Sequence, residues 1–303
     1  MEETVIDTYR DRVHRAKDFI LANPGDRLSI ERVAEIACLS PYHFHRLFRL
    51  TVGESIGRFV QRTLMEAAAK ALRSNRRLTV TRAALDHGYE SADGFSRAFH
   101  RHFGIAPSQW DRSSPLQERK IGRVAEDFPV YTPDELRRFA GEHGFRVELT
   151  SIEERRVAYV RISDAYRRWH RVVEDYHRLV EWYEKGVASH VEHALSGISW
   201  DDPDLTPLER CTFEWAVTVP HGVTVPEWLG ERVMHAVDAA RIYMNGDVRI
   251  EDAVWQYLYR IWLPDGAFDA GPAPAMEMYR RAPHLTGWEH LDMWCVLPIT
   301  RRR

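Results

Sequence analysis

Apolar residues recur at helical spacing through the first third of the chain. Val13, Ala16 and Ile20 lie three or four positions apart, which predicts a helix over 5–22 that ends before the Pro24-Gly25 turn. The same spacing, together with Ser and Thr residues placed to cap helix N-termini, predicts further helices at 30–37, 41–51, 55–74, 79–86 and 91–102. Two of these pairs are joined by tight turns, so the pattern predicts two helix-turn-helix motifs.

The two motifs form an internal repeat, separated by 51 residues. The segments 40–59 and 91–110 share Ser at the start, apolar residues at the same positions, one Arg and one Gly. The matching residues are Ser40/Ser91, Phe44/Phe95, Arg46/Arg97, Phe48/Phe99, Gly53/Gly104 and Phe59/Trp110. Each copy therefore begins a short helix that buries an aromatic stripe.

The opposite side of each short helix carries polar side chains at 100° per residue. Arginine can pair bidentately with guanine, His and Ser can bond base edges or phosphates, and Tyr can stack on thymine methyl groups. An Asp can accept from cytosine, or can instead stabilise the first turn of its own helix, and we favour the second role. The predicted DNA-binding residues are Tyr42, His45, Arg46, Arg49, Asp93, Ser96, Arg97 and His100.

A helix of about 18 residues connects the motifs and spans roughly 27 Å. This length is close to one turn of B-DNA, about 34 Å, so both short helices can enter successive major grooves on one side of a duplex. Arg49 and six further arginines are predicted to contact phosphates. The six are Arg58, Arg62, Arg73, Arg76, Arg77 and Arg101. Residues 41–110 carry a net charge of +6, as a DNA partner requires.

The rest of the chain mixes alternating and helical patterns. After a polar segment and a capped helix over 132–144, alternation predicts strands within 145–163, at 197–200, 213–219 and 291–299. Longer apolar stripes predict helices at 166–185 and 250–263. Two short segments recur 80 residues later in the chain. Arg-Ile occurs at 161–162 and again at 241–242, and Trp182 to Gly186 resembles Trp262 to Gly266. These features predict an α+β domain built from a duplicated strand-helix-strand unit, with an antiparallel sheet and two long helices.

Composition and charge agree with a multidomain protein. At 303 residues the chain is long enough for two domains, and its net charge divides into +5 over 1–120 and −8 over 121–303. Three distant cysteines give no disulfide framework. No signal peptide and no run of about 18 apolar residues is present, so we expect a cytoplasmic protein without a membrane partner.

The first part resembles the DNA-binding domain of the AraC/XylS family. The resemblance covers about 5–112 and rests on the double motif, above all on GYESADGFSRAFHRHFGIAPSQWDR at 88–112. It implies an all-α double helix-turn-helix domain in which the first motif makes most of the base contacts, through Tyr42, His45 and Arg46. The second motif then contributes from Asp93, Ser96 and Arg97, and the family implies double-stranded DNA and RNA polymerase as partners.

The second part resembles the GyrI-like effector-binding domain. The resemblance spans 144–303, after a linker at 113–143, and rests on DDPDLTP at 201–207, WLP at 262–264 and EMY at 277–279. It implies a small amphipathic or cationic aromatic ligand, with Glu277 as counter-charge and Tyr279 beside it. Nine of the ten Trp residues follow residue 165, and rings with a carboxylate hold cations. The further ligand candidates are Trp200, Phe213, Trp215, Tyr166 and Trp169.

Together these observations predict a ligand-responsive transcription regulator, with activation favoured, that needs no cofactor. Two alternatives remain: hydrolase activity using Glu277 and Tyr279, or a ligand-independent protein whose second domain docks a partner. No Gly-x-Ser-x-Gly, P-loop, HExxH or dinucleotide motif supports an enzyme. His190 and His193 are spaced as a possible metal pair, but no third ligand joins them, so no metal site is predicted.

Overall fold

The computed structural model describes residues 2–23, 29–116, 129–187 and 195–302. His190 and His193 lie outside the described residues. Contacts divide the chain into two units. The first contains Met1–Leu72 and Arg76–Arg112, and the second contains Arg73–Asn75 and Ser113–Arg303.

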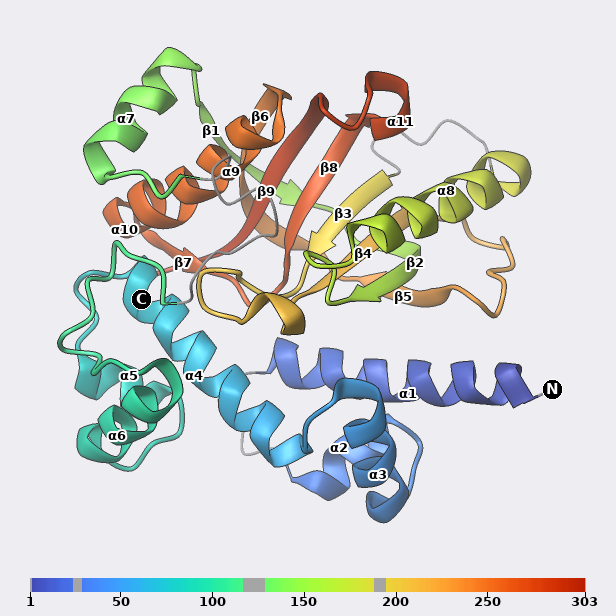
Figure 1. The fold of residues 1–303 in the computed structure, drawn as a ribbon, viewed down its shortest axis with the longest axis horizontal. Helices are drawn as coiled ribbons and strands as arrows, with labels where there is room; N and C mark the ends of the chain where they lie inside the picture. Colours follow the sequence, from blue (N-terminus) through green and yellow to red (C-terminus); the bar gives the residue numbers. More distant parts are fainter. Residues whose placement is uncertain (1, 24–28, 117–128, 188–194, 303) are drawn as a thin grey trace. The chain divides into compact units, whose positions relative to one another are not determined.

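The first unit is entirely helical, as predicted (Figure 1). Its helices are α1 (Glu2–Ala22), α2 (Ile30–Ile36), α3 (Pro41–Val52), α4 (Ile56–Ser74), α5 (Val80–Asp86) and α6 (Ala92–Phe103). Five of the six predicted ranges agree with these bounds to within one residue at each end, whereas α1 begins three residues earlier. The pairs α2–α3 and α5–α6 are the two predicted helix-turn-helix motifs.

Equivalent aromatic residues form the core of each motif. The rings of Phe48 and Phe59 lie 5.3 Å apart in the first copy, and those of Phe99 and Trp110 lie 5.9 Å apart in the second. All four are buried. Since these are positions that the internal repeat shares, the repeat reflects two copies of one packing arrangement.

The second unit is an α+β fold, which confirms the predicted class. Its strands are β1 (Val147–Ile152), β2 (Arg155–Ser163), β3 (Leu195–Ser199), β4 (Thr212–Thr218), β5 (Gly230–Met234), β6 (Val237–Gly246), β7 (Phe268–Ala270), β8 (Ala275–Arg281) and β9 (Leu291–Arg301). Its helices are α7 (Pro133–Glu142), α8 (Trp169–Gly186), the 3₁₀ turn η2 (Leu208–Arg210), α9 (Val248–Tyr257), the π-helical turn η3 (Leu258–Trp262), α10 (Leu263–Asp265) and α11 (Pro283–Thr286).

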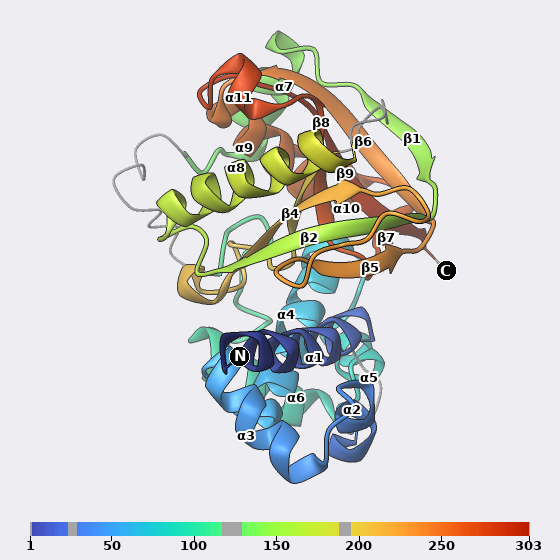
Figure 2. The same ribbon diagram turned by 90° about the vertical axis from the view of Figure 1, so that its right-hand side faces the viewer.

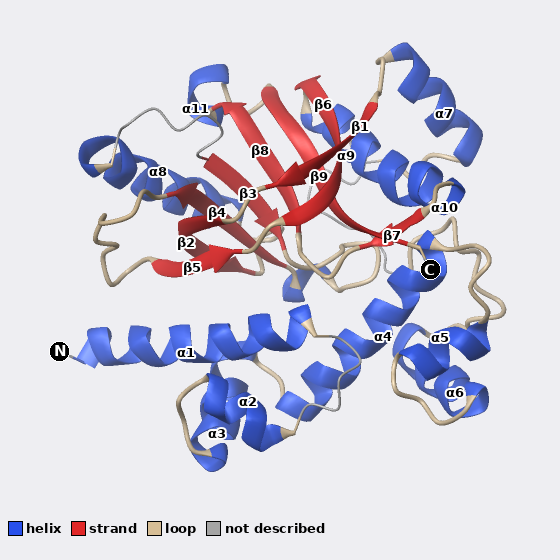
Figure 3. Ribbon diagram, turned by 180° about the vertical axis from the view of Figure 1, so that it is seen from behind, coloured by secondary structure: helices blue, strands red, loops and turns tan. Residues whose placement is uncertain are grey.

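Within the described residues, all strand pairs are antiparallel and follow the order β1-β6-β9-β8-β3-β4-β2-β5, with β7 added beside β9. The strand order is symmetric about its centre. If β1, β2, β3 and β4 are taken as equivalent to β5, β6, β8 and β9, in that order, then reading the sheet from its β5 edge gives the same order as reading it from its β1 edge. The first half consists of β1 to β4 and the second of β5, β6, β8 and β9, and the two halves meet where β3 pairs with β8. The first strand of each half lies at the outer edge of the other half: β1 pairs with β6, and β5 pairs with β2. Figure 3 shows this sheet from behind.

The sequence echoes fall at equivalent places in the two halves. Arg161-Ile162 lies in β2 and Arg241-Ile242 lies in β6. Trp182 to Gly186 forms the end of α8, and Trp262 to Gly266 lies at the end of the segment α9 to α10. Helix α8 packs on β2 and β4, and α9 packs on β6 and β9 (Figure 2). The sheet therefore has a face covered by these helices, here called the helix-covered face, and an opposite face.

The predicted start of one helix in this unit differs from the structure by three residues. Helix α8 begins at Trp169 rather than Tyr166, because residues 164–167 form a turn in which Asp164 has a φ of 56°. The capped helix predicted over 132–144 is α7, and its Leu136 packs against α9. Among the described residues, none of the helices combines the length and the apolar character that crossing a membrane requires.

Candidate functional site

Local sequence fixes both ends of α3. The Ser40 hydroxyl accepts a hydrogen bond from the backbone N–H of His43, and Pro41 occupies the first turn, where its missing N–H costs nothing. Gly53 ends the helix with a φ of 81°, a conformation that glycine adopts without a Cβ clash. The helix is therefore short, and its direction is set by a buried apolar side.

The polar side of α3 is exposed. Tyr42 has 76% of its surface exposed, and His45, Arg46 and Arg49 are also exposed, whereas Phe44 on the other side is completely buried. Among the described residues, neither arginine has an ion-pair partner. The structure therefore brings the four predicted residues together on one solvent-facing surface that carries uncompensated positive charge.

Helix α6 repeats this arrangement with a weaker polar face. Ser91 caps the helix by accepting from the backbone N–H of Gly94 at 3.1 Å. Asp93 lies exposed in the first turn and is not the capping residue, so its proximity to the helix N-terminus remains compatible with either predicted role. Arg97 and His100 are exposed, and Ser96 is half-buried.

Two arginines predicted to contact phosphate are not available for that role, and both predictions are wrong. The guanidinium of Arg62 is buried and pairs with Glu54 at 2.9 Å and Glu66 at 3.0 Å. Arg73 is buried and pairs with Asp202 and, at 3.1 Å, with Asp204. Both lie on the long helix α4, where the sequence alone does not reveal which arginines turn inward to a carboxylate.

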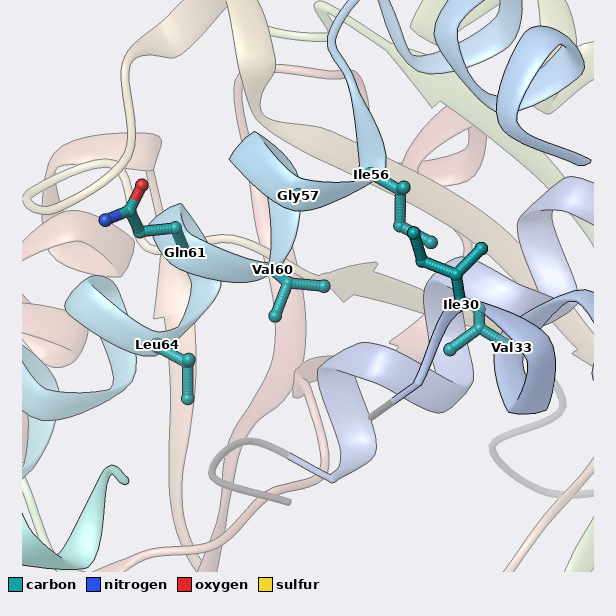
Figure 4. A pocket seen from close by; sticks show the side chains of 7 residues that line it. All are labelled: Ile30, Val33, Ile56, Gly57, Val60, Gln61 and Leu64. Carbon is teal, nitrogen blue, oxygen red and sulfur yellow. The ribbon is translucent and has the colours of Figure 1, made fainter. Parts of the chain in front are cut away.

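A small hollow of about 200 Å³ lies between α2 and α4 (Figure 4). Its lining is apolar apart from one amide side chain and consists of Ile30, Val33, Ile56, Gly57, Val60, Gln61 and Leu64. None of the predicted DNA-binding residues lines it. This hollow is therefore separate from the polar side of α3.

In the second unit, Glu277 lies at the centre of the helix-covered face, on β8. The Tyr279 hydroxyl donates to Glu277 Oε2 at 2.6 Å, and both residues are buried. Burial raises the pKa of Glu277, and burial followed by the nearby carboxyl groups raises the pKa of Tyr279 well above its ordinary value. The predicted counter-charge therefore lies in an environment that disfavours its ionisation unless a cation is present.

Gly197 of β3 makes room for this group. Gly197 pairs with Glu277 in the sheet, and a Cβ at this glycine would lie 2.6 Å from Glu277 Oε2 and 2.7 Å from Cζ of Phe213. Phe213 and Glu277 therefore both lie against the bare backbone of one strand. Trp215 adjoins them, with its ring 5.0 Å from Phe213 and 5.6 Å from Tyr279.

A second carboxyl group, which the sequence interpretation missed, joins the site from α9. Glu251 lies near enough to Glu277 to affect the pKa of that group, and the Trp255 indole donates to Glu251 Oε1 at 3.4 Å. Burial, and then the proximity of Glu277, raise the pKa of Glu251 well above its ordinary value. A signal was present: Glu251 is followed by Val254, Trp255 and Leu258, so it occupies a core-facing position of an apolar stripe.

Further rings extend the cluster toward α8. Tyr176 lies 4.9 Å from Trp215 and 4.8 Å from Trp288, and burial raises the pKa of Tyr176 to about 12. Trp169 is exposed and reaches the cluster only at its rim, 5.9 Å from Trp288. Tyr166 is half-buried in the turn before α8.

Trp200 lies apart from the other predicted ligand residues. It packs on the opposite face of the sheet, where the guanidinium of Arg161 stacks 5.2 Å from its ring. Buried Glu214 lies between Arg161 and Arg232; burial alone raises the pKa of Glu214, but the two ion pairs outweigh it and hold the pKa below its ordinary value. The structure therefore joins Glu277, Tyr279, Phe213 and Trp215, and separates Trp200 from them.

Comparisons with known families agree with this division of the chain. Residues 33–113 match a helix-turn-helix domain of the AraC type, and residues 145–298, just over half of the chain, match the GyrI-like small molecule binding domain. The multiple antibiotic resistance protein MarA of Escherichia coli is 30% identical over 110 residues, which cover 36% of this chain and 85% of MarA.

The chain belongs to the AraC family and carries a GyrI-like domain. This AraC-family regulator is also 32% identical over 117 residues to an HTH-type transcriptional regulator of Haemophilus influenzae, across 38% of this chain and 39% of that protein. It is 32% identical over 90 residues to the HTH-type transcriptional activator AarP of Providencia stuartii, across 30% of this chain and 66% of AarP. The regulator thus spans less than two thirds of these two relatives.

Proposed function

We propose that this DNA-binding transcription regulator places α3 and α6 in two successive major grooves of one duplex. The observation that carries the proposal is the duplicated motif, in which Arg46 and Arg97 occupy the same position and are both exposed without an ion-pair partner among the described residues. A single surface arginine is usually only solvated. Two at one position of a repeated helix-turn-helix favour a shared role.

The connecting helix supports this geometry. Helix α4 has 19 residues, which correspond to about 28 Å at 1.5 Å per residue, and the groove repeat of B-DNA is about 34 Å. A monomer then covers about 20 base pairs, which other helix-turn-helix proteins read as dimers.

The groove-facing residues have separate tasks in this proposal. Arg46 and Arg97 pair with guanine, and Tyr42 contacts a thymine methyl group. The remaining polar side chains bond base edges or phosphates, and they are His45, Arg49, Asp93, Ser96 and His100. Because α3 offers the larger exposed polar face, we assign most base contacts to the first motif.

The proposed effector is a small amphipathic or cationic aromatic molecule bound at Glu277. A buried carboxyl group surrounded by Tyr279, Phe213 and Trp215 supplies both charge and ring faces, which together favour a cation that has its own apolar surface. We include Trp169 and Tyr166 as contacts at the rim, and Trp200 only if the ligand reaches the opposite face. We further propose that the regulator activates transcription and that it does so by contacting RNA polymerase. The relative AarP is named a transcriptional activator, which supports the direction of regulation.

The DNA assignment is tested with Arg46→Ala and Arg97→Ala on a duplex obtained by selection from a random pool. Each loss of a bidentate guanine contact should weaken binding by about 1–3 kcal/mol and relax specificity at one position. Fluorescence anisotropy measures the affinity. Arg82→Ala is the matched control, because Arg82 is exposed but pairs with Asp86 at 2.9 Å. Native affinity in both test variants would overturn the groove assignment.

The effector assignment is tested with Glu277→Gln. Removing a buried charge that faces a cation should weaken binding of a planar aromatic cation by about 10- to 100-fold, while DNA affinity without the cation stays unchanged. Calorimetric titration of the full chain measures the first quantity and anisotropy the second. An unchanged cation affinity would contradict the counter-charge role.

A further inference from the structure

The opposite face of the sheet, away from α8 and α9, carries three arginines on two neighbouring strands. Arg155 and Arg161 lie on β2 at alternate positions with Tyr159 between them, so the three side chains share this face. On the edge strand β5, Arg232 is paired with Val157 of β2 and lies on the same face, diagonal to Arg155. Diagonal neighbours are within reach of long side chains. The three arginines are here called the arginine cluster.

Two members of the arginine cluster share one carboxylate. Glu214 of β4 is completely buried and forms ion pairs with both Arg161 and Arg232. The guanidinium carbon of Arg232 also lies 4.2 Å from the ring centre of Tyr159 and 5.1 Å from that of Trp200. These contacts leave one nitrogen of Arg232 over: its Nη1 is buried and has no hydrogen-bond partner among the described residues.

The third member, Arg155, has no carboxylate partner in the described part of the chain. Its Nη2 donates at 3.6 Å to the thioether of Met276, which is a weak acceptor, and its buried Nε finds no partner within the same ranges. Burial lowers the pKa of Arg155; burial also acts on Arg232, but there Glu214 outweighs it and the pKa is raised. A buried N–H without an acceptor is destabilising, so the arginine cluster has two donors that lack one.

We propose that Arg155 and Arg232 bind a small oxyanion, a phosphate or a carboxylate group, on the opposite face of the sheet. Three guanidinium groups and the single carboxylate of Glu214 add up to a net charge of +2, which an anion reduces. An oxyanion offers several acceptor oxygens, and arginine is the side chain best suited to hold them. Both arginines are half-buried rather than sealed, so an anion can reach them from solvent.

This anion site is separate from the proposed effector site and goes beyond the proposed function. Glu277 lies on the helix-covered face, whereas Arg155, Arg232 and Trp200 belong to the opposite face. The two faces also differ in charge, since one offers a carboxyl group to a cation and the other offers guanidinium groups to an anion. The failure of either site therefore leaves the other standing.

The test is calorimetric titration of the full chain with sodium phosphate and, separately, with sodium acetate, near neutral pH and at constant ionic strength. The native chain should bind at least one of the two, and the anion that binds identifies the oxyanion as phosphate or carboxylate. Arg155→Met keeps an apolar stem but removes the charge and the donors, so it should weaken this binding by about 10- to 100-fold. Arg171→Met is the control, because Arg171 is exposed on α8 and pairs with Glu174 at 3.0 Å. Anions bound at the arginines of α3 or α6 would bind both variants equally.

Thermal unfolding in a buffer without phosphate or acetate separates a binding role of Arg155 from a structural one. Because Arg155 is a partly buried charge without a carboxylate partner, Arg155→Met should unfold at the native temperature or above it. A lower unfolding temperature would mean that Arg155 stabilises the fold through other groups of the protein, and it would overturn the proposal. A native chain that binds neither anion, or equal anion affinity in the native chain and Arg155→Met, would overturn it as well.

Discussion

At the scale of single residues, the effector region depends on a glycine. Gly197 is paired on both sides, with Trp215 in β4 and Glu277 in β8, so its backbone has little freedom to shift. A side chain at this position would press on Glu277 and Phe213, both of which are held by neighbouring rings. The geometry of the site thus depends on the absence of a side chain at Gly197.

Gly197→Ala should therefore destabilise the second unit by about 1–3 kcal/mol, the usual cost of overpacking a core. Thermal unfolding of the full chain followed by calorimetry measures the change. Gly141→Ala is the control, because nothing lies within 4 Å of the Cβ it adds and alanine favours the helix α7. A Gly197→Ala protein as stable as the native chain would show that Glu277 and Phe213 move aside freely.

At the scale of elements, the sequence predicted the helices far better than the strands. Capping residues such as Ser40 and stop signals such as Gly53 act within a few positions of the chain, so α2 to α6 could be placed without tertiary information. Strands β5, β6, β7 and β8 were not predicted. Strand β6 contains Asp, Ala and Asn, which have weak strand preference, and its pairing with β1 and β9 decides its conformation.

The strand connections were equally hidden from the sequence. Strands β1 and β2 follow each other directly in the sequence, yet β1 pairs with β6, and β2 pairs with β4 and β5. This exchange of edge strands involves residues about 90 positions apart, as in the pairing of Val147 with Ile242. Local pattern cannot specify such a partner. The proximity of Glu251 to Glu277 could not be predicted either. It depends on how helix α9 packs on strand β8, which local sequence does not specify.

At the scale of the whole molecule, both units are built by duplication. The first unit repeats a helix-turn-helix with an aromatic core, and the second repeats a set of strands around a central β3–β8 pairing. In each unit the two copies have diverged in polar residues. Helix α3 presents Tyr42, His45 and Arg46 where α6 presents Asp93, Ser96 and Arg97, and Glu251 and Glu277 both belong to the second half of the α+β unit.

The central claim is that one chain reads two grooves through α3 and α6. A hydroxyl-radical footprint on the selected duplex, at a protein-to-DNA ratio fixed by native mass spectrometry, tests it most directly. We expect one chain per duplex and two protected patches on the same side of the DNA, about one helical turn apart. A single protected patch, or protection that appears only when two chains are bound, would contradict it.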